Sequence, residues 1–141
     1  MIELLHGSGD GAFVVVGVKA LVAAFLAVLF LQSGIDKIAD RRGNLLWLKE
    51  HFSRSPFAAV VPALLAVITV VEVVAGALSA AGVAGLLIYG NPGLAILGAM
   101  TSALALLLLF LGQRLAKDYE GAAVLAGYFT LVLVGIYLLR L

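Results

Sequence analysis

The fold of this chain is decided by stretches such as residues 93–112, GLAILGAMTSALALLLLFLG. This stretch contains no charged residue, and its second half, LALLLLFL from Leu104 to Leu111, is apolar on every face of a helix. About 20 apolar residues in an α-helix cross the ~30 Å hydrocarbon core of a bilayer. The alternation of apolar and polar residues that marks the strands of a membrane barrel is missing. The stretch therefore predicts a transmembrane helix.

Three further stretches have the same character, residues 12–33, 57–80 and 121–139. Together they predict an all-α membrane protein, a four-helix up-down bundle in which residues 1–141 form a single domain. The composition agrees, since 64% of the residues are hydrophobic and 12% are charged, whereas soluble domains carry roughly a quarter of charged residues. The net charge of +1 argues against a nucleic-acid partner. The lack of cysteine excludes disulfides, thiolate metal sites and thiol redox chemistry.

The ends of the stretches carry signals of their own. Asn91-Pro92-Gly93 is a turn sequence with proline near a helix start, and Asp118 is a good N-cap for the last helix. Residues 81–90 are apolar but contain three glycines, which favours a compact loop; a longer second helix or an interfacial segment are the alternatives. Residues 1–11 contain no Lys or Arg. They therefore differ from a cleavable signal peptide, and the first apolar stretch is expected to stay in the mature protein.

Basic residues are concentrated in two of the connections between the stretches. These connections contain Lys37, Arg41, Arg42, Lys49, Arg54, Arg114 and Lys117, whereas the opposite side has only Arg140. Because Lys and Arg accumulate in cytoplasmic loops, both connections are expected in the cytoplasm and both termini on the periplasmic side of a bacterial inner membrane. We name the charged residues expected at this membrane surface the collar: Asp36, Lys37, Arg41, Arg42, Arg114, Lys117 and Asp118.

The connection between the first two stretches is longer than a hairpin needs. In residues 44–56, Leu45, Leu48 and Phe52 share one helical face, and Trp47 is suited to the level of the lipid headgroups. This pattern predicts a short amphipathic helix on the cytoplasmic surface. A plain connecting turn with some buried leucines is the alternative.

Two charged residues, Lys19 and Glu72, lie inside the predicted spans. A charge at the bilayer centre costs about 2.5–3.5 kcal/mol, so each should have a partner or a function. Counted from the outer ends of their spans, both lie roughly 10–12 Å deep at 1.5 Å per residue. Thr101 and Ser102 reach nearly the same level. We therefore predict a polar layer in the outer half of the bundle, with Glu72 at its centre and Lys19 as its partner.

Helical spacing extends this layer along two faces. The face on the second span carries Pro62, Leu65, Thr69, Glu72, Gly76 and Ser79, and the face on the fourth carries Tyr119, Ala123, Ala126, Thr130 and Tyr137. The layer has four interpretations. It is a structural ion pair that sets helix register, a binding site for an amphipathic ligand such as a quinone headgroup, or a proton relay. Alternatively, Lys19 extends outward along its helix, and a protonated Glu72 bonds Thr69 or Tyr137.

Several other cofactors are excluded by position. A bis-histidine haem needs two histidines at matching depth, but His6 and His51 are predicted on opposite sides of the membrane. No carboxylate and histidine spacing typical of a di-iron bundle is present. The glycine-rich residues 6–11 lack the Lys-Ser/Thr ending of a phosphate-binding loop. We expect no metal and no covalently bound cofactor, and a quinone is the one cofactor that the polar layer allows.

The order of several short motifs resembles that of the DoxX family of small bacterial membrane proteins. Gly34-Ile35-Asp36-Lys37 closes the first span, and residues 43–52 and Pro62 follow. Glu72-Val-Val-Ala-Gly76 is similar to the acidic residue and glycine of the family's second helix, and residues 112–121 are similar to the stretch before its last helix. The resemblance covers roughly residues 31–139.

This resemblance implies a four-helix membrane bundle associated with respiratory or redox complexes, since relatives include subunits linked to quinol oxidation and to thiosulfate:quinone oxidoreduction. The leading hypothesis is a non-catalytic accessory subunit of such a complex, in contact with other membrane subunits and with quinone or lipid near Glu72. A stand-alone quinone-binding oxidoreductase component is the second hypothesis. A small proton-coupled transporter is the third, because a glutamate inside a four-helix bundle is typical of small multidrug transporters.

Overall fold

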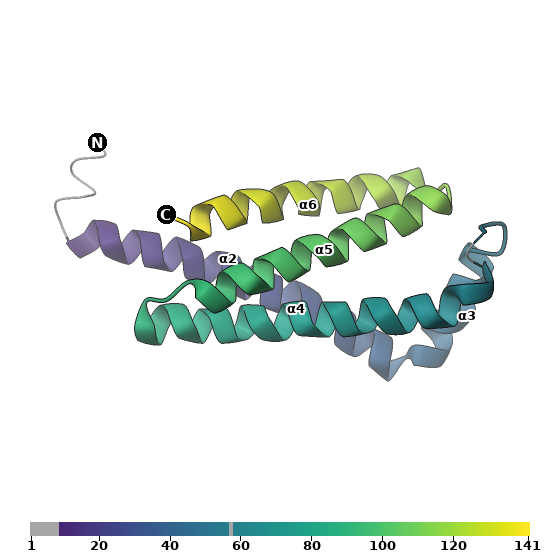
Figure 1. Ribbon diagram of the computed structural model, residues 1–141, viewed down its shortest axis with the longest axis horizontal. Helices are drawn as coiled ribbons and strands as arrows, with labels where there is room; N and C mark the ends of the chain where they lie inside the picture. Colours follow the sequence, from purple (N-terminus) through teal and green to yellow (C-terminus); the bar gives the residue numbers. More distant parts are fainter. Residues whose placement is uncertain (1–8, 57) are drawn as a thin grey trace.

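The computed structural model describes residues 9–56 and 58–141, and this part of the chain is helical apart from short connections. The elements are α2 (Gly9–Ala39), α3 (Arg41–His51), a short 3₁₀ helix η1 (Ala58–Val60), α4 (Val61–Tyr89), α5 (Gly93–Leu115) and α6 (Tyr119–Leu139). Figure 1 shows α2, α4, α5 and α6 running along the long axis of the molecule, with α3 at the end remote from both termini. These four helices are long and apolar enough to cross a membrane. The predicted all-α membrane fold is confirmed.

Two of the helices are longer than their apolar stretches. Helix α2 has 31 residues and α4 has 29, which corresponds to about 46 Å and about 43 Å of helix. The loop predicted for residues 81–90 is wrong, because α4 continues to Tyr89 and ends only at Gly90, which has a φ of 65°. The three glycines of this segment have different roles, because Gly90 ends the helix whereas Gly82 allows close helix packing. Gly82 is buried against Ala95 of α5.

The sequence predicts helix starts after Asn91 and Asp118, and both are confirmed. The side chain of Asn91 accepts a hydrogen bond of 2.8 Å from the Gly93 N–H at the start of α5. Asp118 accepts one of 3.0 Å from the Gly121 N–H at the start of α6. Each side chain satisfies a backbone donor that the helix itself leaves without a partner.

Helix α4 lies between α2 and α5 and packs extensively on both, whereas α6 packs chiefly on α5. The core that they share is made of small and medium apolar side chains, among them Leu26, Phe30, Ala75, Ala99, Leu106 and Val132. Small residues let helix backbones come close together in a bilayer, where packing has to replace the hydrophobic effect. The α2–α4 and α4–α5 contacts therefore determine which polar groups meet.

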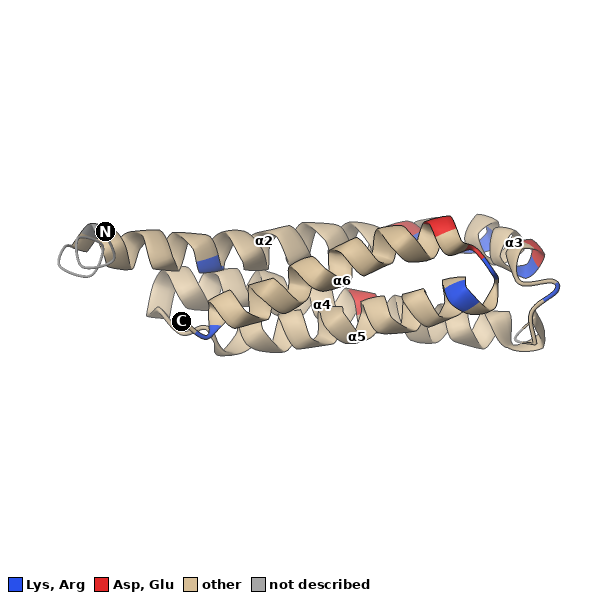
Figure 2. Ribbon diagram, turned by 90° about the horizontal axis from the view of Figure 1, so that it is seen from above, with Lys and Arg blue, Asp and Glu red and all other residues tan. Residues whose placement is uncertain are grey.

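Charged residues gather at one end of the molecule. Figure 2 shows most of the coloured positions at the end that holds α3 and the α5–α6 connection, opposite the two termini. The two basic connections thus lie at the same end, as the sequence predicts. Which side of the membrane this end faces stays a prediction.

The predicted surface helix is confirmed as α3, although it occupies residues Arg41–His51 rather than 44–56. The alternative of a plain turn is wrong. None of the residues of α3 is fully buried, and Leu46 and Trp47 are 63% and 55% exposed. Phe57, which follows this segment, lies outside the described residues. Helix α3 therefore lies on the surface of the bundle.

The close contact at Gly82 gives a first prediction. A Cβ carbon at this position would lie 2.5 Å from the Ala95 Cα, whereas a Cβ at Gly17 would meet no atom within 4 Å. We expect Gly82→Ala to lower the free energy of unfolding by about 1–3 kcal/mol, the usual cost of overpacking. The matched control Gly17→Ala should leave it unchanged or raise it slightly. Unfolding of both variants in mixed micelles measures this difference, and equal stability of the two would contradict the close contact.

Candidate functional site

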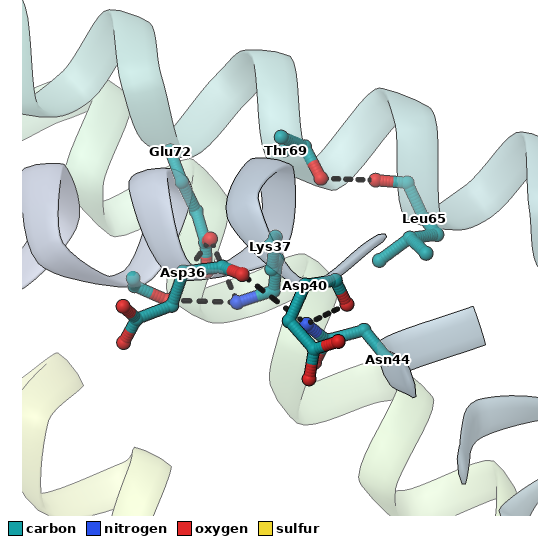
Figure 3. Close-up of polar contacts among 8 residues, drawn as sticks. Asp36, Lys37, Asp40, Asn44, Leu65, Thr69 and Glu72 are labelled. Atoms are coloured by element: carbon teal, nitrogen blue, oxygen red, sulfur yellow. Dashed lines mark hydrogen bonds and ion pairs between the residues drawn. The ribbon is translucent and has the colours of Figure 1, made fainter. Parts of the chain in front are cut away.

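The most deeply buried charge in the described chain belongs to Glu72 in the middle of α4, whose side chain is 1% exposed. Its Oε2 lies 2.9 Å from the Lys37 Nζ and accepts a hydrogen bond of 3.0 Å from the Ser33 hydroxyl. The Lys37 ammonium also donates to the Ser33 Oγ at 2.7 Å. Figure 3 shows Lys37 and Glu72 directed toward each other from α2 and α4. The three side chains form a closed polar triangle, which we call the Lys37–Glu72–Ser33 triad.

Glycines on both helices bring this triad together. A Cβ at Gly34 would lie 2.6 Å from Val73 Cγ2, and a Cβ at Gly76 would lie 2.7 Å from the backbone nitrogen of Leu31. The backbones of α2 and α4 are therefore in close contact over the turn of α4 that follows Glu72. Ser33 and Lys37 are four residues apart and so lie on the face of α2 that meets α4.

The predicted pairing of Glu72 with Lys19 is wrong. Because Gly34 packs on Val73, Lys19 lies about 22 Å farther along α2 at 1.5 Å per residue. Among the acidic side chains that the structure describes, none is within ion-pair distance of Lys19. The depth estimate failed because it ended the second helix at Ala80, whereas α4 continues to Tyr89 and Glu72 lies correspondingly deeper. The partner of Glu72 is Lys37, a residue that the sequence predicts in the collar.

The remaining residues of the predicted layer are not assembled around Glu72. Four of its hydroxyls each donate to a backbone carbonyl four residues earlier in their own helix, those of Thr69, Thr101, Ser102 and Thr130. Tyr137 is 69% exposed. The predicted face of α6 points outward, since its Tyr119, Ala123, Ala126 and Thr130 are also exposed. On α4 the prediction is largely right, because Leu65, Glu72, Gly76 and Ser79 are buried.

The alternative with a protonated Glu72 fails on its partners as well. It required Thr69 or Tyr137 as the hydrogen-bond partner of the carboxyl group, but the partners of Glu72 lie on α2. The Thr69 hydroxyl donates to the Leu65 carbonyl at 2.6 Å (Figure 3). Glu72 is instead satisfied by a hydroxyl and an ammonium group from α2. A carboxylate and an ammonium in contact are the arrangement that a buried charge requires.

An apolar cavity of about 230 Å³ lies next to the triad, between α3, α4 and α5. Trp47, Leu48 and Phe52 form its α3 side, and Lys37 borders it from α2. The α4 and α5 walls include Leu64, Val67, Leu108, Leu111 and Leu115, which are 36–55% exposed on the outside of the bundle. The cavity therefore extends to the surface that a bilayer would cover.

Gln113 of α5 adds a second polar side chain to this cavity. Its Oε1 lies 3.0 Å from the His51 Nε2, and the Asp118 Oδ2 lies 3.6 Å from the same nitrogen. An amide oxygen and a carboxylate oxygen both accept hydrogen bonds, so the His51 Nε2 carries the proton and donates it. The His51 ring also stacks on Trp47 with ring centroids 4.5 Å apart. His51 thereby ties α3 to the end of α5 and the start of α6.

The collar is divided by the fold. Asp118 contacts His51, and the Arg114 guanidinium lies over the Tyr119 ring, 4.6 Å from its centroid. Asp36, Arg41, Arg42 and Lys117 are exposed. Lys37, although predicted in the collar, belongs to the Lys37–Glu72–Ser33 triad. The sequence held one signal for this, the i, i+4 spacing of Ser33 and Lys37 on the inner face of α2.

Among the described residues there is no group of three or more His, Cys, Asp or Glu side chains placed to hold a metal ion. Comparisons with models of known protein families, with curated proteins and with solved structures found no match to this chain.

Proposed function

We propose that this integral membrane protein binds a quinone-type lipophilic molecule in the cavity beside Lys37 and serves as an accessory subunit of a membrane redox complex. The observation that carries the proposal is the position of the triad. A buried ion pair borders an apolar cavity that reaches the lipid-facing surface. Binding sites for small lipophilic molecules combine such apolar walls with a few polar groups that orient the ligand.

The size of the cavity supports a headgroup as the occupant. Its volume of about 230 Å³ is below the roughly 300–1,000 Å³ of sites that enclose a whole drug-sized ligand. A quinone ring would occupy the cavity, and its isoprenoid tail would leave between the exposed leucines of α4 and α5. The bilayer would then deliver the ligand without a passage through water.

The role of accessory subunit rests on the resemblance of residues 31–139 to the DoxX family. The order of Gly34-Ile-Asp-Lys37, Glu72 and Gly76 supports it, and two of these residues, Lys37 and Glu72, belong to the triad. In this proposal electron transfer belongs to a partner subunit, and the chain holds the quinone near it. A bacterial inner membrane with the collar in the cytoplasm is part of the same proposal.

Native mass spectrometry of the gently solubilised complex tests both parts. We expect the chain to be released together with stoichiometric partner subunits and about one quinone per copy. Release of partner subunits without quinone would contradict the proposed quinone ligand. Quinone bound to the chain alone would contradict the accessory role and favour a stand-alone quinone-binding component. The absence of both would refute the proposal.

A further inference from the structure

We propose that the cavity selects an uncharged headgroup that accepts two hydrogen bonds, one from the Lys37 ammonium and one from the Gln113 amide. This inference rests on the proposed function and specifies its ligand class. It makes Gln113 a specificity-determining residue and His51 a positioning residue.

The first contact follows from the donors of Lys37. An ammonium group has three N–H donors and no acceptor. Two of them are directed to the Ser33 Oγ and the Glu72 Oε2, at 2.7 and 2.9 Å. Lys37 is 19% exposed and borders the cavity, so its third N–H is available to an acceptor on the ligand.

The charge of the cavity favours a neutral acceptor over an anion. Lys37 is the only charged side chain among the described residues that line the cavity, and Glu72 compensates its charge within the triad. The nearest cation on α5, Arg114, is engaged with the Tyr119 ring. A carboxylate or phosphate headgroup would therefore enter an apolar site without a free counter-charge, and burying an unpaired charge is costly. A quinone carbonyl avoids this cost.

The second contact depends on the orientation of Gln113. The carboxylate of Asp118 lies beside the His51 Nε2, so this nitrogen carries the proton, and the Gln113 oxygen accepts it. With its oxygen engaged by His51, Gln113 has its two amide N–H groups left as donors. The Gln113 Nε2 lies beside Gly121 at the start of α6, and the proposal requires one of its N–H groups to face the cavity. Lys37 and Gln113 then supply donors from two different helices to one ligand, which suits a molecule with two separate carbonyl oxygens.

Trp47 provides a direct readout, because it is the single tryptophan of the chain and borders the cavity. The full chain in nanodiscs of neutral lipid is titrated with a short-chain benzoquinone, and quenching of Trp47 fluorescence gives the Kd. A carboxylic acid with a tail of the same length is the competitor. We expect the quinone to quench saturably and the carboxylate to need at least a tenfold higher concentration to displace it.

Two glutamine variants form the matched pair. Gln113→Leu should raise the quinone Kd about tenfold, whereas Gln32→Leu, at an exposed position of α2, should leave it unchanged. For His51, a leucine should weaken binding and a glutamine, which keeps an N–H donor for Gln113, should restore it. If the role of His51 is purely structural, the quinone Kd of its variants will instead change in parallel with their thermal midpoints of unfolding.

The outcomes separate the two proposals. If the carboxylic acid displaces the quinone at a concentration equal to or below that of the quinone, the preference for an uncharged headgroup is overturned. Saturable quinone binding would still support the proposed function. Equal Kd values for Gln113→Leu and Gln32→Leu overturn the role of Gln113. If no quinone binds at all, both proposals fall. If Gln113→Leu does not fold, the competition experiment, which uses the unaltered chain, decides.

Discussion

Replacing Lys37 with methionine should lower the free energy of unfolding by about 3 kcal/mol, the cost of leaving one member of a buried ion pair without its partner. Glu72 is 1% exposed and has its only counter-charge in Lys37 among the described residues. Methionine keeps much of the length of the lysine side chain but offers neither charge nor donor. The Glu72 carboxylate would then keep a single hydrogen bond, from Ser33.

Lys19→Met is the matched control, because Lys19 lies on the same helix and has no acidic partner in the described part of the chain. We expect it to change stability little or to raise it. The double variant Lys37→Met/Glu72→Gln should recover most of the loss, since a buried pair replaced by uncharged groups of similar size is often neutral. Reversible unfolding in mixed micelles measures all three. Equal stability of Lys37→Met and Lys19→Met would refute the triad as a structural element.

Filling the cavity should abolish quinone binding without unfolding the protein. Gly112 borders the cavity, and a Cβ there would meet the Phe52 ring at 3.5 Å, an ordinary contact distance. Gly112→Leu therefore places a side chain in the space between α5 and α3 without a backbone clash. We expect the quinone Kd to rise at least tenfold, because the leucine occupies volume that the headgroup needs.

The control for this variant is Gly127→Leu on α6, where a Cβ would meet no atom within 4 Å. The two substitutions change helix propensity and hydrophobicity in the same way, so a difference in quinone Kd reports the cavity alone. Trp47 quenching provides the Kd, and circular dichroism verifies the helices. Unchanged affinity in Gly112→Leu would place the quinone elsewhere.

Much of the architecture was predictable from local patterns. Long uncharged stretches such as residues 93–112 can avoid water only by spanning a bilayer, and their backbone groups must then be satisfied within a helix. Asp118 was recognisable as an N-cap because its carboxylate acts on the backbone three residues ahead. The amphipathic segment around Trp47 was predictable for the same reason, since helical periodicity is a property of neighbouring residues.

The candidate site was predictable only in part. Glu72 stood out because a charge within an apolar stretch needs compensation, but its partner depended on how far α4 extends. The glycines of residues 81–90 appeared to end the helix, and the resulting error in length assigned Glu72 to the depth of Lys19. Glycine has no side chain, so it serves a turn and a close helix contact equally well. The distinction depends on the neighbouring helix.

The sequence by itself therefore determined that this protein is a set of apolar helices with charged connections and one buried carboxylate. The tertiary structure decided what that carboxylate meets. The close approach at Gly34 and Gly76 brings α2 against α4. The resulting register between the two helices places Lys37 and Ser33 beside Glu72, and no local sequence pattern indicates it. The cavity has the same origin, because its α5 wall, residues 108–115, is distant in the chain from the other lining residues, which lie between 37 and 68, and meets them only after folding.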